Sequence, residues 1–235
     1  MSEFTAAASA LQGAPDGADL CRPFLAVFDV SGVGVSTLGA PLGSGTVCAS
    51  DAVAERVDEI QLDLGEGPCW EALSIGRPVL EHDLATTQST RWPAALEALL
   101  RAGVGAVFSF PMRVGTIPVG AVDLSVDRGH VLTADQVRGA VELTEVAARR
   151  VLRNAILEAA ADGRADMAGG RYSRREVHQA TGMVAAQLDL GVADALLVLQ
   201  AHAFATERTV RDVAADIVDR RIDLGADQAD RGSGH

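Results

Sequence analysis

The sequence predicts an α+β protein in which an antiparallel sheet flanked by helices is followed by a long helix and a small three-helix module. Three observations predict this fold class. Paired runs rich in Val, Phe and small residues alternate around turn residues between residues 33 and 126. One long stretch of helical periodicity covers 133–160, and three shorter stretches follow within 171–224.

Composition and charge narrow the function classes. The 235 residues are 48% hydrophobic, which is enough for a core, and the net charge is -12. Residues 171–224 contribute only -1 to that charge because they hold seven Arg. A general nucleic-acid binder is normally basic, so any RNA affinity of this chain must come from a local Arg cluster.

Targeting signals and cysteine usage predict a cytoplasmic protein. The apolar runs are far shorter than the roughly 20 residues that span a membrane. The first residues show no basic stretch followed by an apolar one, and therefore no signal peptide. Cys21, Cys48 and Cys69 are odd in number, widely spaced and without a CxxC pair. This argues against a disulfide framework or a zinc site, and no metal site is predicted.

The N-terminal elements follow from local patterns. Residues 1–17 are rich in Ala, Gly and Ser and predict a flexible or loosely helical N-terminus. Residues 19–30 fit a helix that covers a sheet. The alternating runs 33–38 and 45–50, with Pro and Gly between them, predict a hairpin.

The middle of the chain continues the alternation of helices and strands. The next predicted elements are a helix, a loop leading into a short helix that starts near Pro68, a strand and a second helix, at 52–62, 65–72, 77–81 and 92–102. Two Val- and Phe-rich strands, 104–114 and 118–126, predict a second hairpin. Thr133 is expected to cap the long helix, whose apolar side comprises Val137, Val141, Thr144, Ala148, Val151, Leu152 and Ile156. The segment 161–170, with its Gly and Asp residues, is predicted to be a linker.

The C-terminal module consists of three apolar stripes at helical spacing, which begin at Val177, Val192 and Val210. Thr209, with Asp212 three residues later, has the pattern of a capping box and predicts the start of the third helix. About fifty residues are few for an independent core. The module is therefore expected to act as an output unit attached to a larger domain.

This module resembles a known family. Five features follow one another at matching spacing: Gln-Ala-Thr-Gly-Met-Val-Ala-Ala-Gln at 179–187, Asp-Ala-Leu at 194–196, His-Ala-Phe at 202–204, Arg208, and Val-Ala-Ala-Asp-Ile-Val at 213–218. Together they resemble an ANTAR domain, the RNA-binding output module of bacterial transcription antiterminators. The resemblance implies a dimer that binds a pair of RNA stem-loops and blocks formation of a terminator hairpin.

The resemblance spans 174–222 and departs from the family pattern in two places. Gln200 stands where relatives often carry Arg, which alters part of the RNA contact surface. Gly191 stands where relatives often carry a Ser that caps the second helix, which predicts a looser start to that helix.

A second resemblance covers roughly residues 20–155. Its motifs are Gly-Glu-Gly-Pro-Cys-Trp-Glu-Ala at 65–72, Arg-Pro-Val at 77–79, Arg-Trp-Pro at 91–93, Val-Phe-Ser-Phe-Pro at 107–111 and Val-Gly-Ala-Val-Asp-Leu at 119–124. They resemble the GAF domain of actinobacterial GAF–ANTAR proteins. GAF domains are sensory modules, and their pocket lies between the sheet and the loops and helices over one face.

The two resemblances imply a domain organisation. A flexible N-terminus at 1–17 precedes a GAF domain at 18–160, which includes the long helix. After the linker, an ANTAR domain occupies 171–224, and a flexible tail ends the chain at 225–235.

The RNA-binding residues are predicted at polar positions of the ANTAR module. Arg at a helix N-terminus opposes the helix dipole, which favours a phosphate-contact role for Arg171, Arg174 and Arg175 over a surface cluster that binds nothing. The other candidates are His178, Gln179, Gln187, His202, Arg208 and Arg211. A buried, hydrogen-bonded His202 fits the pattern equally well. Gly182 costs about 1 kcal/mol inside a helix, and a close helix–helix approach explains its presence.

The candidate ligand pocket of the sensor comprises Cys69, Trp70, Trp92 and Phe108. Packing of the helices onto the sheet is the interpretation we favour for the cysteine and the two tryptophans. Cys69 also stands at a helix start, where a thiolate is favoured, so a redox thiol is an alternative. No residue set supports haem, a cyclic nucleotide or a metal, so no cofactor is predicted and the GAF ligand is left open.

For two further positions, the pair His82 and Asp83 and the residue Asp123, we favour a structural interpretation over a functional one. His82 and Asp83 are neighbours on a strand and point to opposite faces, which favours a solvent-facing strand end over an acid–base or metal-binding pair. Asp123 interrupts an apolar strand, so it either points inward with a functional role or lies on the solvent-facing side of an edge strand, and we favour the second interpretation.

The sequence thus predicts a regulator and not an enzyme. A GAF sensor, dimerised through helix 133–160, controls an ANTAR module that binds tandem stem-loops in transcript leaders. A small-molecule ligand or an upstream signalling protein would supply the input. One alternative is a GAF-fold thiol-dependent reductase, and another is a ligand sensor with a protein-binding helical output. DNA binding is disfavoured because the chain is acidic and shows no helix-turn-helix pattern.

Overall fold

The computed structural model describes residues 3–15, 18–87, 90–162, 175–206 and 208–224. The chain forms two compact units, Met1–Ser173 and Arg174–His235. We call the first the sheet unit and the second the helical unit. Apart from the last two residues of a helix that ends at Asp162, the predicted linker lies outside the described residues, as does the predicted tail.

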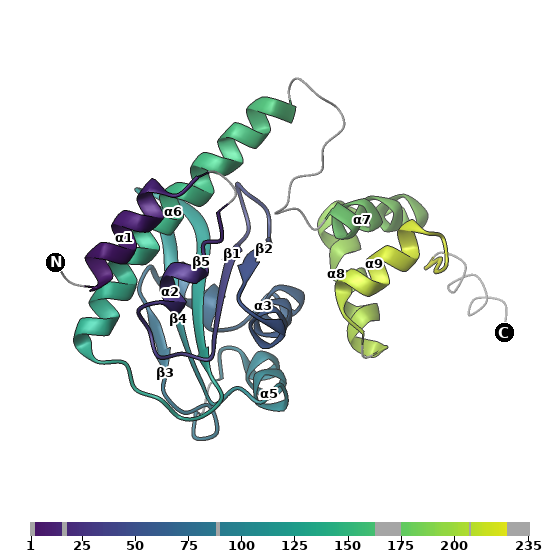
Figure 1. Ribbon diagram of the computed structural model, residues 1–235. Helices are drawn as coiled ribbons and strands as arrows, with labels where there is room; N and C mark the ends of the chain where they lie inside the picture. The colour runs from purple at the N-terminus through teal and green to yellow at the C-terminus, as the bar shows by residue number, and fades with distance from the viewer. Residues whose placement is uncertain (1–2, 16–17, 88–89, 163–174, 207, 225–235) are drawn as a thin grey trace, which may run out of the picture. The chain divides into compact units, whose positions relative to one another are not determined.

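Among the described residues, five antiparallel strands form one sheet in the order β2-β1-β5-β4-β3. Their bounds are β1 Gly32–Thr37, β2 Gly45–Ala49, β3 Val79–Glu81, β4 Ala106–Val114 and β5 Ile117–Val126. Strands β1 and β2 form the first predicted hairpin, and β4 and β5 form the second. Pairing of β1 with β5 joins the two hairpins, which makes β5 the central strand (Figure 1).

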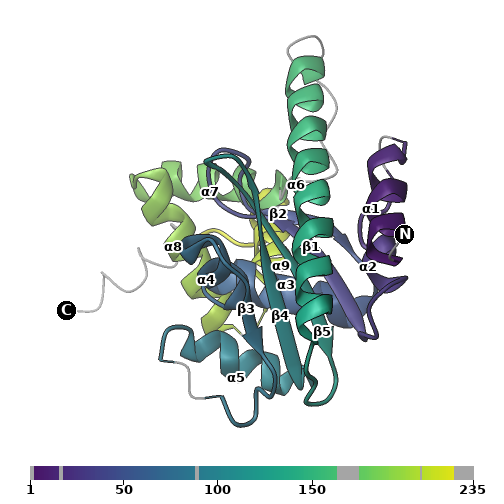
Figure 2. The same ribbon diagram turned by 90° about the vertical axis from the view of Figure 1, so that its left-hand side faces the viewer.

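Helices cover both faces of this sheet (Figures 1 and 2). One face is covered by α1 (Glu3–Gly13), α2 (Arg22–Leu25) and α6 (Ala134–Asp162). The other is covered by α3 (Ala52–Leu64), α4 (Pro68–Ile75) and α5 (Pro93–Arg101). We call them the α6 face and the α3 face.

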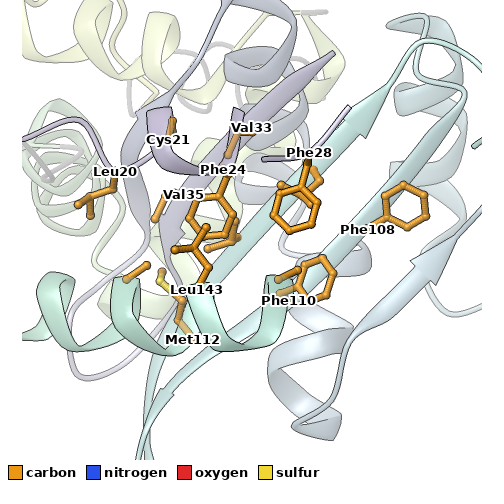
Figure 3. Packing of buried hydrophobic residues seen from close by; sticks show 14 of the residues in the cluster. Leu20, Cys21, Phe24, Phe28, Val33, Val35, Phe108, Phe110, Met112 and Leu143 are labelled. Atoms are coloured by element: carbon orange, nitrogen blue, oxygen red, sulfur yellow. The ribbon is translucent and has the colours of Figure 1, made fainter. Parts of the chain in front are cut away.

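Alternation along the strands divides the side chains between the two faces. On β4, Phe108, Phe110 and Met112 enter the core of the α6 face, together with Leu143 of α6 (Figure 3). Val107, the neighbour of Phe108 on the same strand, packs instead in a cluster on the α3 face. Burial of each large apolar side chain contributes about 1.5–3 kcal/mol relative to exposure, which makes the α6 face the main apolar core.

Local sequence explains where helices begin and end. Asp51 accepts hydrogen bonds from two backbone N–H groups in the first turn of α3. Gly65 ends this helix with a φ of 63°, a conformation that favours glycine. Thr133 and Gln136 exchange reciprocal hydrogen bonds at the start of α6, which confirms the predicted cap.

Most of the N-terminal segment, which the sequence predicts to be flexible or loosely helical, is a helix packed on α6. Residues 3–13 form α1, and Leu11 is fully buried in the α6-face core. Gly139 of α6 makes this packing possible, because a Cβ there would lie 2.5 Å from the ring of Phe4. Arg150 of α6 donates to the carbonyl oxygens of Ala14 and Pro15, at 2.5 and 2.7 Å. Contacts with a helix 136 residues away hold this segment in place.

The helix predicted over 19–30 is also wrong in extent. Only Arg22–Leu25 is helical, as the single turn α2. Phe24 and Phe28 both enter the core within one turn of each other, and the chain then turns into β1 at Gly32. This leaves no length for further helical turns.

The apolar side of α6 is buried within the sheet unit. Thr144, Ala148 and Val151 lie against the sheet in the α6-face core or beside it. Their burial therefore does not require a second subunit, contrary to the argument from sequence. Nearer the C-terminal end of α6, Ile156 and Leu157 remain 59% and 51% exposed.

The helical unit comprises α7 (Arg175–Leu188), α8 (Val192–Ala205) and α9 (Val210–Val218), as the three stripes predict. Its core consists of Val177, Ala180, Val184, Ala195, Leu199, Ala203, Val210, Val213, Ala214, Ile217 and Leu224. The predicted cap at Thr209 is confirmed, since its side chain accepts a hydrogen bond from the backbone of Asp212 at 3.1 Å. Gly191 is the N-cap residue of α8 and provides no side-chain hydrogen bond to the helix start.

Over the described residues, none of the helices is both long and apolar enough to cross a membrane.

Candidate functional site

A buried polar network lies on the α3 face of the sheet. Asp123 of β5 is only 5% exposed, and its carboxylate accepts hydrogen bonds from Ser109 of β4 and from Gln61 Nε2 of α3, the latter at 2.6 Å. The interpretation of Asp123 as an exposed residue of an edge strand is therefore wrong. Pairing with β1 makes β5 the central strand, and α3 covers this side of it.

Asp58 of α3 forms the second half of the network. Its carboxylate accepts hydrogen bonds from Ser36 of β1 and Thr46 of β2. Asp58 and Gln61 are three residues apart and lie on one face of the helix. Helix α3 therefore meets the sheet partly through carboxylate and amide groups, each of which needs a polar partner when buried.

The segment 65–72 is built around the Gln61 side chain. Cys69 N donates to Gln61 Oε1 at 2.9 Å, and Trp70 Nε1 donates to the Gln61 carbonyl oxygen at 2.8 Å. Gly67 has a φ of 137°, and a Cβ there would lie 2.7 Å from atoms of Gln61. The side-chain amide of Gln61 thus connects Asp123 to the start of α4. Gly67 must be glycine because the chain passes directly over the Gln61 side chain at that position.

Two glutamates of the same segment hold α5. Glu66 Oε1 accepts a hydrogen bond from Ala95 N at 2.9 Å. Glu71 pairs with Arg91 and accepts a hydrogen bond from Trp92 Nε1 at 2.7 Å. The indole N–H of Trp92 thus has a hydrogen-bond partner and the ring is buried under α5. Trp92 therefore has a packing role.

Burial perturbs two titratable groups of the network. It raises the pKa of Asp123 to about 6, although the hydrogen bonds from Ser109 and Gln61 offset part of the shift. Burial also raises the pKa of the Cys69 thiol well above its ordinary value, and the nearby carboxylates of Asp123 and Asp58 raise it further. Cys69 is therefore a protonated thiol at neutral pH, which argues against a role as a nucleophile.

The four residues predicted to line one pocket lie in three separate hydrophobic clusters. Cys69 and Trp70 pack together beside Leu38, while Trp92 packs in a second cluster under α5. Phe108 lies on the α6 face, where its ring is 5.6 Å from that of His82. Strand alternation separates Phe108 from the others, so the structure does not bring these residues into one site.

The pair His82 and Asp83 lies just after β3. His82 is exposed, as expected for a solvent-facing strand end, and its Nδ1 is 3.3 Å from the carbonyl oxygen of His130. Asp83 Oδ1 accepts a hydrogen bond from Ala85 N at 3.1 Å and stabilises the following turn.

The sequence argues against a disulfide framework and leaves the roles of the cysteines open. The structure joins Cys21 and Cys48 by a disulfide, with their Cα atoms 6.2 Å apart. Spacing in the sequence does not show this pairing, because the two cysteines approach only when β2 lies beside the segment that begins α2. Within the described part of the chain, Asp19 and these two cysteines are the group close enough to share a metal ion.

The outer surface of α7 carries three of the predicted RNA-binding residues. His178, Gln179 and Gln187 are exposed, and the exposed small residues Gly182 and Ala186 lie between them along the helix. This surface is opposite the stripe that packs in the core. Gly182 does not serve a close helix–helix approach, contrary to expectation, because nothing lies within 4 Å of a Cβ built there.

The remaining candidates are distributed over the helical unit. His202 of α8 is half-buried and Arg211 of α9 is exposed. Arg208 pairs with Asp216 at 2.6 Å, and this hydrogen bond lowers the pKa of that carboxylate, with Arg221 adding to the effect. Arg208 therefore connects the residue before the Thr209 cap to a carboxylate in the second half of α9. The predicted contacts Arg171 and Arg174 lie outside the described residues, as does the side chain of Arg175.

Reasoning from the sequence missed the polar network of the α3 face, although the network is visible in the sequence as polar residues at interior positions. Asp58 and Gln61 interrupt an otherwise apolar helical stripe at a spacing of three residues. Ser109 and Asp123 interrupt apolar strands that form one hairpin. Polar residues at matching interior positions of neighbouring elements indicate mutual hydrogen bonding.

Family comparisons agree with this geometry. A model described as GAF domain matches residues 4–151, which is more than half of the chain, and a model described as ANTAR domain matches 170–218. The chain belongs to the GAF–ANTAR proteins. Its sheet unit is the GAF domain and its helical unit is the ANTAR domain. No curated protein matches the chain.

Solved structures resemble the GAF domain in fold. The GAF domain of a phosphoenolpyruvate-protein phosphotransferase from Acinetobacter is 10% identical, with a TM-score of 0.50 over 65% of this chain and 95% of that one. The GAF domain of a two-component sensor histidine kinase from Bacillus halodurans is 11% identical, with a TM-score of 0.46 over 58% and 91%. A type II free methionine-R-sulfoxide reductase from Thermoplasma acidophilum is 17% identical, with a TM-score of 0.45 over 65% and 96%.

The family assignment carries a general function. An ANTAR domain is an RNA-binding antitermination module, and a GAF domain is a sensor domain. Their combination is typical of regulators rather than enzymes. The chain is thus a GAF–ANTAR regulator with the signal-transduction architecture of sensor followed by output.

Proposed function

We propose that this GAF–ANTAR protein is a cytoplasmic regulator whose ANTAR domain binds tandem RNA stem-loops in transcript leaders and prevents terminator formation. The GAF domain controls this binding or holds two ANTAR domains together. Binding to both stem-loops would stabilise the alternative RNA structure at the expense of the terminator hairpin.

The exposed face of α7 supports RNA loops as the ligand. Its imidazole and amide groups at His178, Gln179 and Gln187 offer donors and acceptors for base edges. Gly182 and Ala186 leave room for a base or sugar to approach the helix backbone. Unpaired loop bases present both edges and faces, whereas the bases in an RNA duplex are difficult to reach.

Charge supports loop recognition over nonspecific phosphate binding. Residues 171–224 are nearly neutral, with a net charge of -1. Each phosphate contact adds roughly one unit to the slope of log affinity against log salt. A module that relies on a few Arg contacts should therefore show a shallow salt dependence and a strong dependence on loop sequence.

A homodimer fits a tandem RNA site, because two equal protein sites match two equal stem-loops. Ile156 and Leu157 support α6 as the dimer contact, since they are exposed on the last turns, which extend past the sheet (Figure 2). Pairing of these turns across a two-fold axis would bury both side chains and bring the chains together shortly before each ANTAR domain.

The input is proposed to act on the α3 face of the GAF domain. Asp58, Gln61 and Asp123 hold the helical cover to the sheet by hydrogen bonds. A small-molecule ligand or an upstream signalling protein would exert its effect by rearranging these bonds. Any such effector needs polar groups of its own to replace those partners.

A transcription assay with purified RNA polymerase tests this function. The template carries a leader with two stem-loops before a terminator, and a second template carries a single stem-loop. Wild-type protein should raise read-through on the first template only. Replacement of Arg174, Arg175 and Arg211 by Ala should abolish the effect.

A matched control removes the same charge elsewhere. Arg101, Arg128 and Arg149 are exposed on the GAF domain, and the ion pairs that they form there are exposed and worth little. Their replacement by Ala should leave read-through within about twofold of wild type, since surface changes of this kind have small effects. Unchanged termination at protein concentrations that saturate the RNA would refute the proposal.

The second candidate function, a protein-binding output, is favoured by one observation. Leu197 and Phe204 are 64% and 70% exposed and lie seven residues apart on one side of α8. Their replacement by Ser should leave RNA read-through unchanged if this surface binds a protein. Loss of read-through with retained fold would place it in the RNA interface instead.

A further inference from the structure

We propose that Cys21 and Cys48 form a reversible thiol–disulfide switch, closed by a peroxide oxidant and opened by a dithiol reductant, that fastens the start of α2 to edge strand β2. The proposal rests on the proposed function in one respect, namely that the protein acts on transcripts in a reducing compartment. Disulfides in such compartments are usually transient, catalytic or redox-sensing rather than structural.

The backbone brings the two cysteines within bonding distance. Their Cα atoms are 6.2 Å apart, inside the range that a disulfide requires. Cys21 is fully buried, and its backbone N–H donates to Asp19 Oδ1 at 2.9 Å, which fixes its position at the start of α2. Cys48 is half-buried on β2, an edge strand that pairs only with β1.

An irregularity in β2 directs Cys48 toward its partner. Thr46 points to the α3 face, where it donates to Asp58, and regular alternation would direct Cys48 to the same face. The register shifts between Val35 and Ser36, so that Cys48 pairs with Val35. Val35 belongs to the α6-face core, and Cys48 therefore lies on that side beside Cys21. β-Bulges often re-aim a side chain in this way.

The third cysteine does not compete for this pairing. Cys69 lies on the opposite face of the sheet, in a cluster with Trp70 and Leu38. It is buried, and its raised pKa keeps the thiol protonated. Thiol–disulfide exchange needs a thiolate with access to a sulfur atom, so Cys69 is not the resolving group.

The chemistry of closure follows from the difference in exposure. The Cys48 thiolate attacks one oxygen of hydrogen peroxide, the O–O bond breaks, and hydroxide leaves with a proton as water to give Cys48 sulfenic acid. The Cys21 sulfur then attacks the Cys48 sulfur, and the S–O bond breaks to release a second water. The two thiols are oxidised by two electrons and the peroxide is reduced to two waters.

Opening reverses the electron flow. One thiolate of the dithiol attacks Cys48, the more accessible sulfur, and Cys21 leaves as a thiolate that takes up a proton. The second thiol of the reductant attacks its own mixed disulfide and releases Cys48. The reductant becomes a cyclic disulfide and the protein regains two thiols.

The switch is connected to the helix that leads toward the ANTAR domain. Cys21 ends the segment that follows α1, and the carbonyl oxygens of Ala14 and Pro15 in that segment accept hydrogen bonds from Arg150 of α6. The closed disulfide restrains Cys21 at the start of α2, and Arg150 restrains Ala14 and Pro15 after α1. Opening should therefore loosen α1 on α6, with the rest of the sheet unit unchanged.

Peptide mapping of the full-length protein tests the pairing directly. Trypsin cleaves after Arg but poorly before Pro, so Cys21 and Cys48 fall in the fragment 1–56 and Cys69 falls in 57–91. Alkylation after denaturation in chelator should label both cysteines of 1–56 in dithiothreitol-treated protein and neither after hydrogen peroxide. Dithiothreitol added to the native oxidised protein should restore both labels. Fragment 57–91 should carry one label throughout and serves as the internal control.

Hydrogen exchange tests the structural consequence. Amides of 3–13 and 20–25 should exchange at least several-fold faster in the reduced than in the oxidised wild type. Cys21→Ser and Cys48→Ser proteins should exchange at the reduced rate under both conditions. RNA affinity should differ between oxidised and reduced wild type and should not respond to peroxide in either variant.

Each contrary result overturns a defined part of the proposal. Labelling of 1–56 after peroxide refutes the pairing, and labels that native dithiothreitol treatment fails to restore identify a permanent disulfide instead of a switch. Stoichiometric zinc binding by the reduced protein that blocks oxidation would make Asp19, Cys21 and Cys48 a metal site instead. Equal RNA affinity in both redox states would refute the connection to the output, whereas absence of RNA binding in both states would refute the proposed function and leave the pairing result unaffected.

Discussion

The two faces of the GAF sheet use the same strands for different purposes. The core of the α6 face is built mainly from apolar side chains and buries Phe108, Phe110 and Met112 beneath α6. The α3 face buries five polar side chains at its centre, namely Ser36, Asp58, Gln61, Ser109 and Asp123. The hydrophobic effect stabilises a folded core without requiring particular orientations of the side chains. A buried polar group, in contrast, needs a hydrogen-bond partner in the right position. The contrast supports the proposal that the input acts on the α3 face, where a signal could exchange polar partners, and not on the α6 face.

In the ANTAR domain, polar residues are gathered on an exposed helix surface, whereas those of the α3 face are buried. Its core is apolar, and its polar residues His178, Gln179 and Gln187 point to solvent on α7. Polar groups at the GAF α3 face already have partners within the chain, whereas those of α7 are available to a partner outside it. The following predictions test this contrast, beginning with the largest expected effect.

Loss of an aromatic ring from the α6 face should have the largest effect. Phe110 is fully buried, so Phe110→Ala should lower the free energy of unfolding by about 3–5 kcal/mol. Chemical denaturation monitored by far-UV circular dichroism measures the loss. The control Phe110→Leu retains most of the volume and should cost less than about 1.5–2 kcal/mol. Equal losses for the two variants would show that volume does not govern this face.

Loss of a single polar partner on the α3 face should cost less. Gln61→Leu removes partners from Asp123 Oδ2 and Cys69 N, each worth about 1–3 kcal/mol when left unsatisfied in the interior. Denaturation should show a loss of about 2–4 kcal/mol at pH 7. Arg56→Leu, at an exposed position of the same helix, is the control and should change stability by less than about 0.5 kcal/mol. A near-neutral Gln61→Leu would contradict the network.

Titration of Asp123 should give the α3 face a pH dependence that the α6 face lacks. The pKa of Asp123 in the folded protein is about 6 against an ordinary value of 3.8, so between these pH values the unfolded state loses its proton first. The free energy of unfolding should therefore fall as pH rises from 4 to 7, by about 2 kcal/mol from this group. Below both pKa values the group contributes nothing to the change.

The variant Asp123→Asn isolates this contribution, because other carboxylates titrate in the same range. Denaturation curves at pH 4, 5, 6 and 7 should show a wild-type decline that is smaller in the variant by about 2 kcal/mol. Parallel curves for the two proteins would show that Asp123 ionises in the folded state as it does in the unfolded chain.

The smallest effect on stability is expected on α7. Gly182→Ala should raise the stability of the ANTAR domain by up to about 1 kcal/mol, because alanine favours the helix and nothing lies near the new Cβ. The same change should weaken RNA binding if a base approaches the backbone there. Ala186→Gly is the opposite control, since it should lower stability and keep the surface open. Unchanged RNA affinity in Gly182→Ala would remove this glycine from the interface.

Local features of both domains were predictable from the sequence. The alternation of apolar and polar residues predicted both hairpins, and capping residues predicted the starts of α6 and α9. These signals depend only on residues that are close in the sequence. Family resemblance placed the two domains in order. The core stripes of the ANTAR helices were predicted because a helical face is set by spacing alone.

Features that depend on distant parts of the chain were missed. Helix α1 has a weak apolar pattern and owes its place to contacts with Gly139 and Arg150 of α6. The burial of Asp123 depends on β1 pairing with β5, which no local pattern shows. The disulfide depends on the register shift that turns Cys48 to the α6 face, since unbroken alternation predicts the wrong side.

RNA binding by the full-length protein tests the central claim most directly. Fluorescence anisotropy should compare a tandem stem-loop RNA, a single stem-loop and a tandem RNA with scrambled loops, at two salt concentrations. The tandem RNA with intact loops should bind at least about tenfold more tightly than the others, a difference of about 1.4 kcal/mol. Replacement of Arg174, Arg175 and Arg211 by Ala should remove that preference, and replacement of Arg101, Arg128 and Arg149 should not. Equal affinity for all three RNAs, or none for any at low salt, would contradict the account.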